Sequence, residues 1–177
     1  MMLRLEHLQQ ADDGFNTIIE IYTDAFPREE RREVSHIKEL LANEPSYHLT
    51  AIYQTDDPAD QIIGLLSYWE LGEAVFIEHF AIDSRRRGNG VGSEALQMIV
   101  NHLENRPIVL EVERPETAIA RRRIEFYRRQ QFVLWDLPYR QPPYRNGDDW
   151  LPMCLMTNGF APTQALIRRL HQTVYHH

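Results

Sequence analysis

The stretch FAIDSRRRGNGVGSEAL, at residues 80–96, passes from apolar residues through three arginines to glycines at every second position. Its apolar start predicts a strand that ends at Ile82, and its later apolar positions predict a helix that begins near Asn89. A helix N-terminus presents free backbone N–H groups and about half a positive charge, which favours phosphate. The stretch therefore predicts a pyrophosphate cradle, in which glycines leave the backbone open and arginines add charge-assisted bonds. The residues concerned are Gly88, Gly90, Gly92, Arg85, Arg86 and Arg87.

Two familiar phosphate-binding loops fit this stretch less well. A Walker A loop needs Lys and then Ser or Thr after its last glycine, whereas Ser93-Glu94 follows Gly92. A dinucleotide loop needs G-x-G-x-x-G, and Ser93 holds the place of its last glycine, although Glu111 lies about 20 residues on, where that fold has its ribose-binding acid. A Rossmann-type dinucleotide binder and a glycine-rich connection without a ligand remain as alternatives.

The rest of the chain predicts a mixed α/β sheet. Strands are expected at residues 3–8, 47–54, 61–70, 74–82, 108–113, 132–137 and 150–157, and TDDPAD at residues 55–60 is expected to close a hairpin. Helices are expected after Asp12 and Asp13, from Pro27 to Asn43, at 89–103 and 116–130, and after Pro162. The order β-α-α-β-β-β-α-β-α-β-β-α has its clear βαβ crossover at the glycines. We expect one domain over residues 1–177.

Composition narrows the functional class. Hydrophobic residues make up 43% and charged residues 25% of the 177, as in ordinary globular proteins, and no apolar run approaches the roughly 20 residues of a membrane span. A formal net charge of −7 argues against nucleic-acid binding. Cys154 is the single cysteine, and no His, Asp or Glu cluster has metal-ligand spacing, so we expect no metal. These features predict a cytoplasmic protein without nucleic-acid or membrane partners.

Two motifs resemble those of a known family. RGNGVG at residues 87–92 fits the R/Q-x-x-G-x-G/A signature of the GCN5-related N-acetyltransferases (GNAT), and Phe126-Tyr127 followed by Gln131-Phe132 resembles their Y-x-x-x-G-F motif. The expected element order also agrees with that family from Leu3 to Thr157. The resemblance implies a mixed, mostly antiparallel central sheet with helices on both faces.

The resemblance also implies a cofactor, acetyl-coenzyme A. Its pyrophosphate would bind the backbone amides of the motif, and its pantetheine arm would pair with the backbone of Phe80 and Ile82 like an added strand. Arg85 or Arg86 could reach the 3′-phosphate. The motif residues expected to bind the cofactor are Arg87, Gly88, Asn89, Gly90, Val91 and Gly92.

The implied activity is transfer of an acetyl group to a primary amine of a small molecule or peptide, by direct attack in a ternary complex. Tyr127 is the candidate general acid, unless it only packs with Ala120 and Ile124. Glu78, in an apolar strand, and Glu111, in LEV, are the candidate bases, with a water relay or no protein base as alternatives. A non-catalytic acyl-CoA or nucleotide sensor is the competing function.

Other segments carry further expectations. Residues 139–150 are expected to form the wall of the acceptor site, where Asp148 and Asp149 could attract a cationic amine, or to be an ordinary hairpin loop. Gln131 stands where the family usually has glycine, so that helix end must be capped without one. A homodimer is conceivable through the last helix, and the terminal histidines are native or a tag remnant; the residues are Leu166, Leu170, Val174, His176 and His177.

Overall fold

The computed structural model describes residues 2–55 and 60–175. The middle of the expected hairpin turn at 55–60 and both terminal histidines, His176 and His177, lie outside the described residues. The chain has two compact units, and strands β3 (Gln61–Glu70) and β4 (Val75–Ile82) contribute residues to both. Unit 1 comprises Met1–Tyr68 and Glu78–Ile99, and unit 2 comprises Trp69–Ile77 and Val100–His177. The single domain over residues 1–177 stays a prediction.

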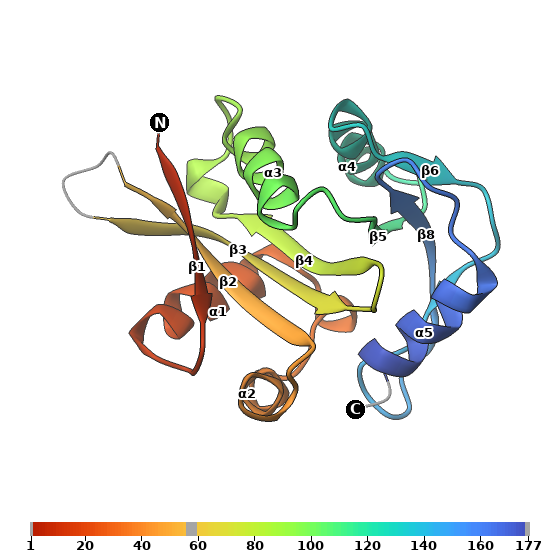
Figure 1. The fold of residues 1–177 in the computed structure, drawn as a ribbon, viewed down its shortest axis with the longest axis horizontal. Coiled ribbons are helices and arrows are strands. Elements are labelled where there is room, and N and C mark those ends of the chain that lie inside the picture. The colour runs from red at the N-terminus through yellow and green to blue at the C-terminus, as the bar shows by residue number, and fades with distance from the viewer. Residues whose placement is uncertain (1, 56–59, 176–177) are drawn as a thin grey trace. The chain divides into compact units, whose positions relative to one another are not determined.

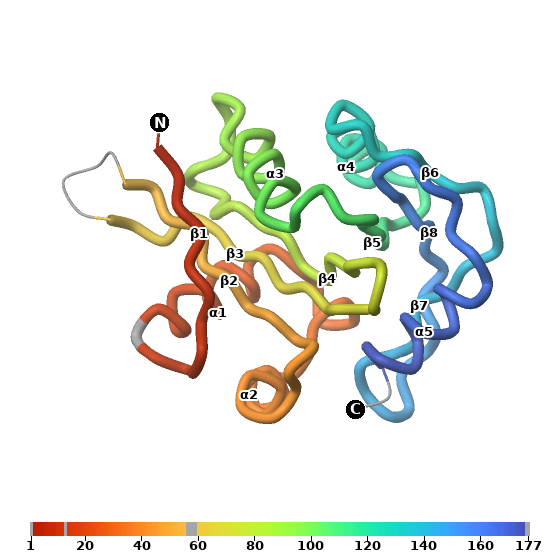
Figure 2. The backbone as a smooth tube through the Cα atoms, in the orientation of Figure 1, coloured from red at the N-terminus to blue at the C-terminus, as the bar shows by residue number. Residues whose placement is uncertain are grey.

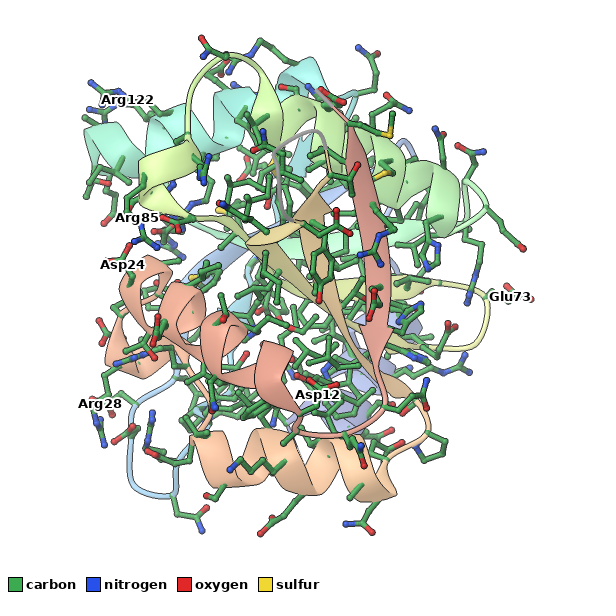
Figure 3. All side chains as sticks on the ribbon, turned by 90° about the vertical axis from the view of Figure 1, so that its left-hand side faces the viewer. Asp12, Asp24, Arg28, Glu73, Arg85 and Arg122 are labelled. Carbon is green, nitrogen blue, oxygen red and sulfur yellow. The ribbon has the colours of Figure 1, made fainter. Side chains whose placement is uncertain are left out.

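Unit 1 is a sheet of strands β1 to β4 with helices on both of its faces. Helices α1 and α2 lie on one side of the strands and α3 lies on the other, as Figures 1 and 3 show from two directions. Strands β1 and β2 pair antiparallel from Leu3↔Gln54 to Leu8↔Leu49. The further elements are β1 (Leu3–Leu8), α1 (Asp13–Ala25), η1 (Arg28–Glu30), α2 (Val34–Asn43), β2 (Tyr47–Gln54), η2 (Ser84–Arg86) and α3 (Val91–His102).

Helix α1 of unit 1 begins and packs as its sequence pattern predicts, but the one helix expected from Pro27 to Asn43 is divided into η1 and α2, because Arg31 and Glu33 between them have extended backbone. The Asp12 side chain accepts a hydrogen bond from the Gly14 N–H over 3.0 Å, which caps α1. Helix α1 then buries Phe15 and Ile18, and α2 ends at Asn43 as expected. Gly64 on β3 lets the backbone of β4 come close at Ala81, because a Cβ on residue 64 would lie 2.5 Å from the Ala81 carbonyl oxygen.

Unit 2 is built around two central strands, β5 (Ile108–Glu113) and β8 (Leu151–Thr157), which pair antiparallel. Strand β4 pairs parallel with β5 from Val75↔Ile108 to Ile77↔Leu110. Short strands β6 and β7 both pair antiparallel with β8. Figure 2 shows β7 beside α5 in this unit. The remaining bounds are α4 (Ala118–Arg129), β6 (Val133–Trp135), β7 (Arg140–Gln141) and α5 (Gln164–Val174).

The complete strand order confirms the predicted fold class. The eight-stranded sheet runs β1-β2-β3-β4-β5-β8-β6, with β7 paired to β8. The parallel pair β4–β5, joined through α3, is the crossover predicted at the glycines. In the described part of the chain, no helix has the length and apolar character needed to span a bilayer.

The last third of the chain departs from the expected boundaries. The strand expected at 132–137 is limited to Val133–Trp135, and the two-residue strand β7 was not expected. Trp135 ends its strand with an Nε1–H that donates to Thr157 Oγ1 on β8 over 2.8 Å. Leu170 and Val174 of α5 are fully buried within the chain and Leu166 is partly exposed, and the homodimer stays a prediction.

Helix α4 ends in a left-handed residue that is not glycine. Gln131 has φ +67°, and the N–H groups of Gln131 and Phe132 donate back to the carbonyls of Arg128 and Tyr127. This is the Schellman arrangement, in which glycine is usual because its backbone adopts positive φ without strain. We expect Gln131→Gly to raise the free energy of unfolding by about 1 kcal/mol, since a left-handed backbone costs other residues about 1–2 kcal/mol.

Urea denaturation at neutral pH measures this change. The matched control is Gln130→Gly. Gln130 has a negative φ of −95°, so glycine relieves no backbone strain at that position. Equal effects of the two substitutions would contradict the assignment of strain to Gln131.

Candidate functional site

The loop after β4 is anchored by Asp83. The Asp83 N–H donates to the Ile63 carbonyl over 2.8 Å, and its carboxylate accepts hydrogen bonds from the backbone and guanidinium of Arg85. These hydrogen bonds lower the pKa of Asp83. Arg85 also lies next to Asp24 of α1 (Figure 3), whose charge adds to that of Asp83 in raising the pKa of Arg85. Arg85 is thus engaged by carboxylates of the protein, and its contact with a 3′-phosphate stays a prediction.

The glycine loop at residues 87–90 is exposed, and its residues 88–90 have positive φ angles. The φ angle is +101° at Gly88, +50° at Asn89 and +79° at Gly90. A Cβ on Gly88 or Gly90 would meet no atom within 4 Å. Within residues 2–55 and 60–175, no hydrogen bond engages the backbone N–H of Gly88, Asn89, Gly90 or Gly92. The loop therefore offers a row of amides at the start of α3, which fits the predicted phosphate site.

The backbone of β4 leads into this loop. Because the Asp83 N–H points to β3, strand alternation places the N–H and C=O groups of Phe80 and Ile82 on the opposite edge. Both residues lie beyond Ile77↔Leu110, the last pair of the β4–β5 register. The Ile82 carbonyl accepts a hydrogen bond from Arg87 Nε over 2.9 Å, so the motif arginine stabilises its own loop.

Glu78 forms a buried ion pair with Arg32. Nε and Nη2 of Arg32 each lie 2.8 Å from Glu78 Oε1, and the two side chains are 2% and 0% exposed. Glu78 Oε2 lies 3.7 Å from His79 Nδ1. Burial by itself raises the pKa of Glu78, but Arg32 and His79 together bring it well below its ordinary value. Glu78 is therefore held as an anion, which makes it a weak proton acceptor.

Further hydrogen bonds hold residues 30–32, which follow α1, next to this ion pair. The Arg32 N–H donates to the Tyr22 hydroxyl over 2.8 Å. His79 Nε2 lies 2.8 Å from the Glu30 carbonyl, and His79 Nδ1 lies 3.1 Å from Ser67 Oγ. Both ring nitrogens of this buried histidine thus have protein partners.

Tyr127 is buried at the end of α4, with 8% of its surface exposed. Its ring contacts those of Phe126 and Phe132 at centroid distances of 5.2 and 5.7 Å. Burial raises the pKa of Tyr127 to about 12, against an opposing effect of Arg123 and with a contribution from Glu113. The phenol is therefore protonated throughout the neutral range. Packing and a role as an acid are both compatible with this position.

Glu111 is bound by two phenols from different elements. The hydroxyl of Tyr139, just before β7, donates to Glu111 Oε1, and the hydroxyl of Tyr175, just after α5, donates to Oε2 over 2.6 Å. Tyr139 is 3% exposed, and burial together with the Glu111 charge raises its pKa far above its ordinary value. His171 Nε2 lies 3.2 Å from the same Tyr139 hydroxyl.

The segment at 139–150 packs on α5 through its aromatic rings. Tyr144 contacts Tyr175 at a centroid distance of 5.2 Å, and Trp150, which is 45% exposed, contacts His171 at 5.6 Å. Its role as the acceptor wall stays a prediction. In the part of the chain that the structure describes, no three His, Cys, Asp or Glu side chains gather as a metal site requires.

The predicted site residues divide between the two units. Glu78, Phe80 and the glycine loop belong to unit 1, whereas Tyr127 and Glu111 belong to unit 2. Sequence reasoning missed Arg32 and Tyr175 as partners of the two candidate bases, and it missed His171, which lies 3.2 Å from the Tyr139 hydroxyl. An acid within an apolar strand signals that a partner exists, but it does not identify a partner 46 residues away, as Arg32 is.

Comparison with known proteins decides the family. The model of the Acetyltransferase (GNAT) family matches residues 15–132. The chain belongs to the GNAT family. A solved structure described as a GNAT-family acetyltransferase from Bacteroides thetaiotaomicron is 37% identical, with a TM-score of 0.88, over 97% of this chain and 98% of its own. No curated protein matches the sequence.

More distant solved structures share the fold. Naa50 of Arabidopsis thaliana, in complex with the bisubstrate analogue CoA-Ac-MVNAL, is 18% identical with a TM-score of 0.61, over 90% of this chain and all of its own (100%). A chimera of the spermidine N-acetyltransferase SpeG from Vibrio cholerae and hSSAT is 13% identical with a TM-score of 0.65, over 89% and 95% of the two chains. At these identities the comparison establishes a common GNAT fold.

Proposed function

We propose that this GNAT-family chain is an acetyl-CoA-dependent N-acetyltransferase that acetylates a primary amine of a small molecule or peptide. The observation that carries the proposal is the open row of amides at Gly88, Asn89, Gly90 and Gly92, which no protein group engages among the described residues. The name of the Naa50 structure includes a conjugate of CoA with a peptide, and the name of the SpeG structure includes spermidine. Both support this cofactor and these classes of amine.

The residues of unit 1 would hold the cofactor. The amides from Arg87 to Gly92 would bind its pyrophosphate at the positive end of α3, and the edge of β4 at Phe80 and Ile82 would pair with its amide-containing arm. At Ile82 the N–H is the group we assign, because Arg87 already donates to the carbonyl. When bound, acetyl-CoA supplies the thioester as the acetyl donor for direct attack by the amine.

The proton-transfer roles fall to Tyr127 and a carboxylate. Tyr127 would hold a proton on its phenol oxygen for the departing sulfur, and its raised pKa of about 12 keeps that proton in place until it is needed. Of the two candidate bases, we assign Glu111 to accept the amine proton. Glu78 is less suited, since its side chain is 0% exposed and is bound by Arg32 in a buried ion pair, which an acceptor amine would have to break.

An assay of thiol release tests the proposal. The purified chain is incubated with acetyl-CoA and a panel of small-molecule and peptide amines, and CoA binding is measured in parallel by calorimetry. We expect saturable turnover with at least one amine. CoA binding without turnover on any acceptor would favour a sensor, and binding of NAD in preference to CoA would favour a dinucleotide protein.

We expect Tyr127→Phe to lower kcat by about 10²-fold, which is typical of the loss of one acid–base group, with little change in the affinity for CoA. The variant keeps the ring and its contacts with Phe126 and Phe132, so the fold is expected to persist. Steady-state kinetics and calorimetry measure the two effects. The control is Tyr53→Phe in unit 1, which removes the hydroxyl of a ring that lies under the Arg4 guanidinium. An unchanged kcat in Tyr127→Phe would limit Tyr127 to packing.

A further inference from the structure

The C-terminal part of the chain contributes polar groups to the candidate base. Tyr139, His171 and Tyr175 all lie after residue 132, where the match to the family model ends. Two of them donate hydrogen bonds to Glu111, one to each carboxylate oxygen. The family match therefore does not include these contacts, which the chain forms with the end of α5 and with the residue before β7.

The two phenols fix the position of the carboxylate. One donor on each oxygen restricts the rotation of the group. Hydrogen bonds to the charged form of an acid favour that form. Tyr139 is itself held, because His171 Nε2 lies 3.2 Å from its hydroxyl and the two rings are in contact at 5.4 Å.

Two further elements of unit 2 have their own contacts near Glu111. On β8, the residue opposite Glu111 is the buried, apolar Leu155. On α4, Arg123 forms its ion pair with Glu113, two residues farther along β5. The groups whose hydrogen bonds carry the inference are the two phenols on Glu111, with His171 beside the Tyr139 hydroxyl.

We propose that Tyr175, with Tyr139, is a positioning residue that holds the Glu111 carboxylate oriented to accept the proton of the acceptor amine. The inference rests on the proposed function, in which Glu111 is the base. It makes the end of α5 part of the catalytic machinery, acting through Glu111 and not by contact with the substrate.

A double-mutant cycle with Tyr175→Phe and Glu111→Gln tests the proposal. Tyr175→Phe keeps the ring that contacts Tyr144 and removes only the hydroxyl. We expect it to lower kcat about tenfold with an unchanged KM for acetyl-CoA, and to move the acid limb of the pH–rate profile upward by about one pH unit. In the Glu111→Gln background it should have no further effect on kcat.

Equilibrium unfolding of the same four proteins gives a readout that is independent of activity. At neutral pH we expect Tyr175→Phe to change the equilibrium constant of unfolding about tenfold more in the wild-type protein than in the Glu111→Gln variant. Absence of this coupling, or an unchanged pH profile while Glu111→Gln is inactive, would overturn the positioning role and leave the acetyltransferase intact. Coupling in a protein with no acetyl transfer to any amine would support the contact and reject the proposed function.

Discussion

Gly90→Glu is expected to weaken the binding of coenzyme A by more than a hundredfold, or about 3 kcal/mol, because a like charge facing the pyrophosphate costs several kcal/mol. At φ +79°, with no atom within 4 Å of the Cβ position, the new side chain would enter the open space in front of the amides. The fold should persist, since the change meets no neighbouring atom and adds only the strain of a left-handed residue, about 1–2 kcal/mol.

Isothermal titration calorimetry with CoA and thermal unfolding measure the two effects of Gly90→Glu. The matched control is Gly159→Glu, at an exposed glycine of unit 2 with φ +102° and equally open surroundings. It introduces the same charge and similar strain away from the cradle, so it should bind CoA normally. Wild-type affinity in Gly90→Glu would remove the phosphate site from this loop.

Arg32→Met is expected to lower the free energy of unfolding by about 3–5 kcal/mol at neutral pH, the usual effect of leaving one partner of a buried ion pair uncompensated. Glu78 would then be a charge with 0% side-chain exposure and without its guanidinium. The double variant Arg32→Met with Glu78→Met should recover most of the loss, because two apolar side chains need no partner. Urea denaturation of the three proteins measures the changes.

The pH dependence of this loss has a definite sign. In the native protein the pKa of Glu78 is lowered, so the pair stabilises the fold above the ordinary carboxylate pKa, and its contribution disappears only as the pH falls through the lowered value. Without Arg32, burial raises the pKa of Glu78, and acid neutralises the unpaired charge. The penalty of Arg32→Met should therefore shrink as the pH falls below about 5. A penalty that is independent of pH would mean that the loss comes from packing.

The features that sequence predicts here are those encoded by neighbouring residues. The cap at Asp12, the end of α2 at Asn43 and the glycine loop depend on side-chain chemistry and backbone freedom within a few residues. Gln131 follows the same rule, because the Schellman bonds of α4 require a left-handed residue there whatever its side chain. Local patterns of this kind suffice for the fold class and for the candidate phosphate site.

Contacts that join distant segments could not be predicted in the same way. The apolar setting of Glu78 indicates a partner, but the choice of Arg32 among 19 lysines and arginines depends on how the segment after α1 crosses β4. Tyr175 and Glu111 are 64 positions apart, and their hydrogen bond depends on where α5 ends. Strand β7 has two residues, too few for an alternating pattern, and exists because β8 offers it a partner.

The hydrogen bond from Arg87 to the Ile82 carbonyl has an evolutionary consequence. If the proposed phosphate site lies on this loop, its donors are main-chain N–H groups, which every residue type except proline provides. Substitution of Asn89 or Ser93 would then leave these donors unchanged, provided that position 89 still tolerates its φ of +50°. Binding of the acetyl donor would in that case be insensitive to side-chain changes in the loop, and acceptor preference could change through substitutions elsewhere in the chain.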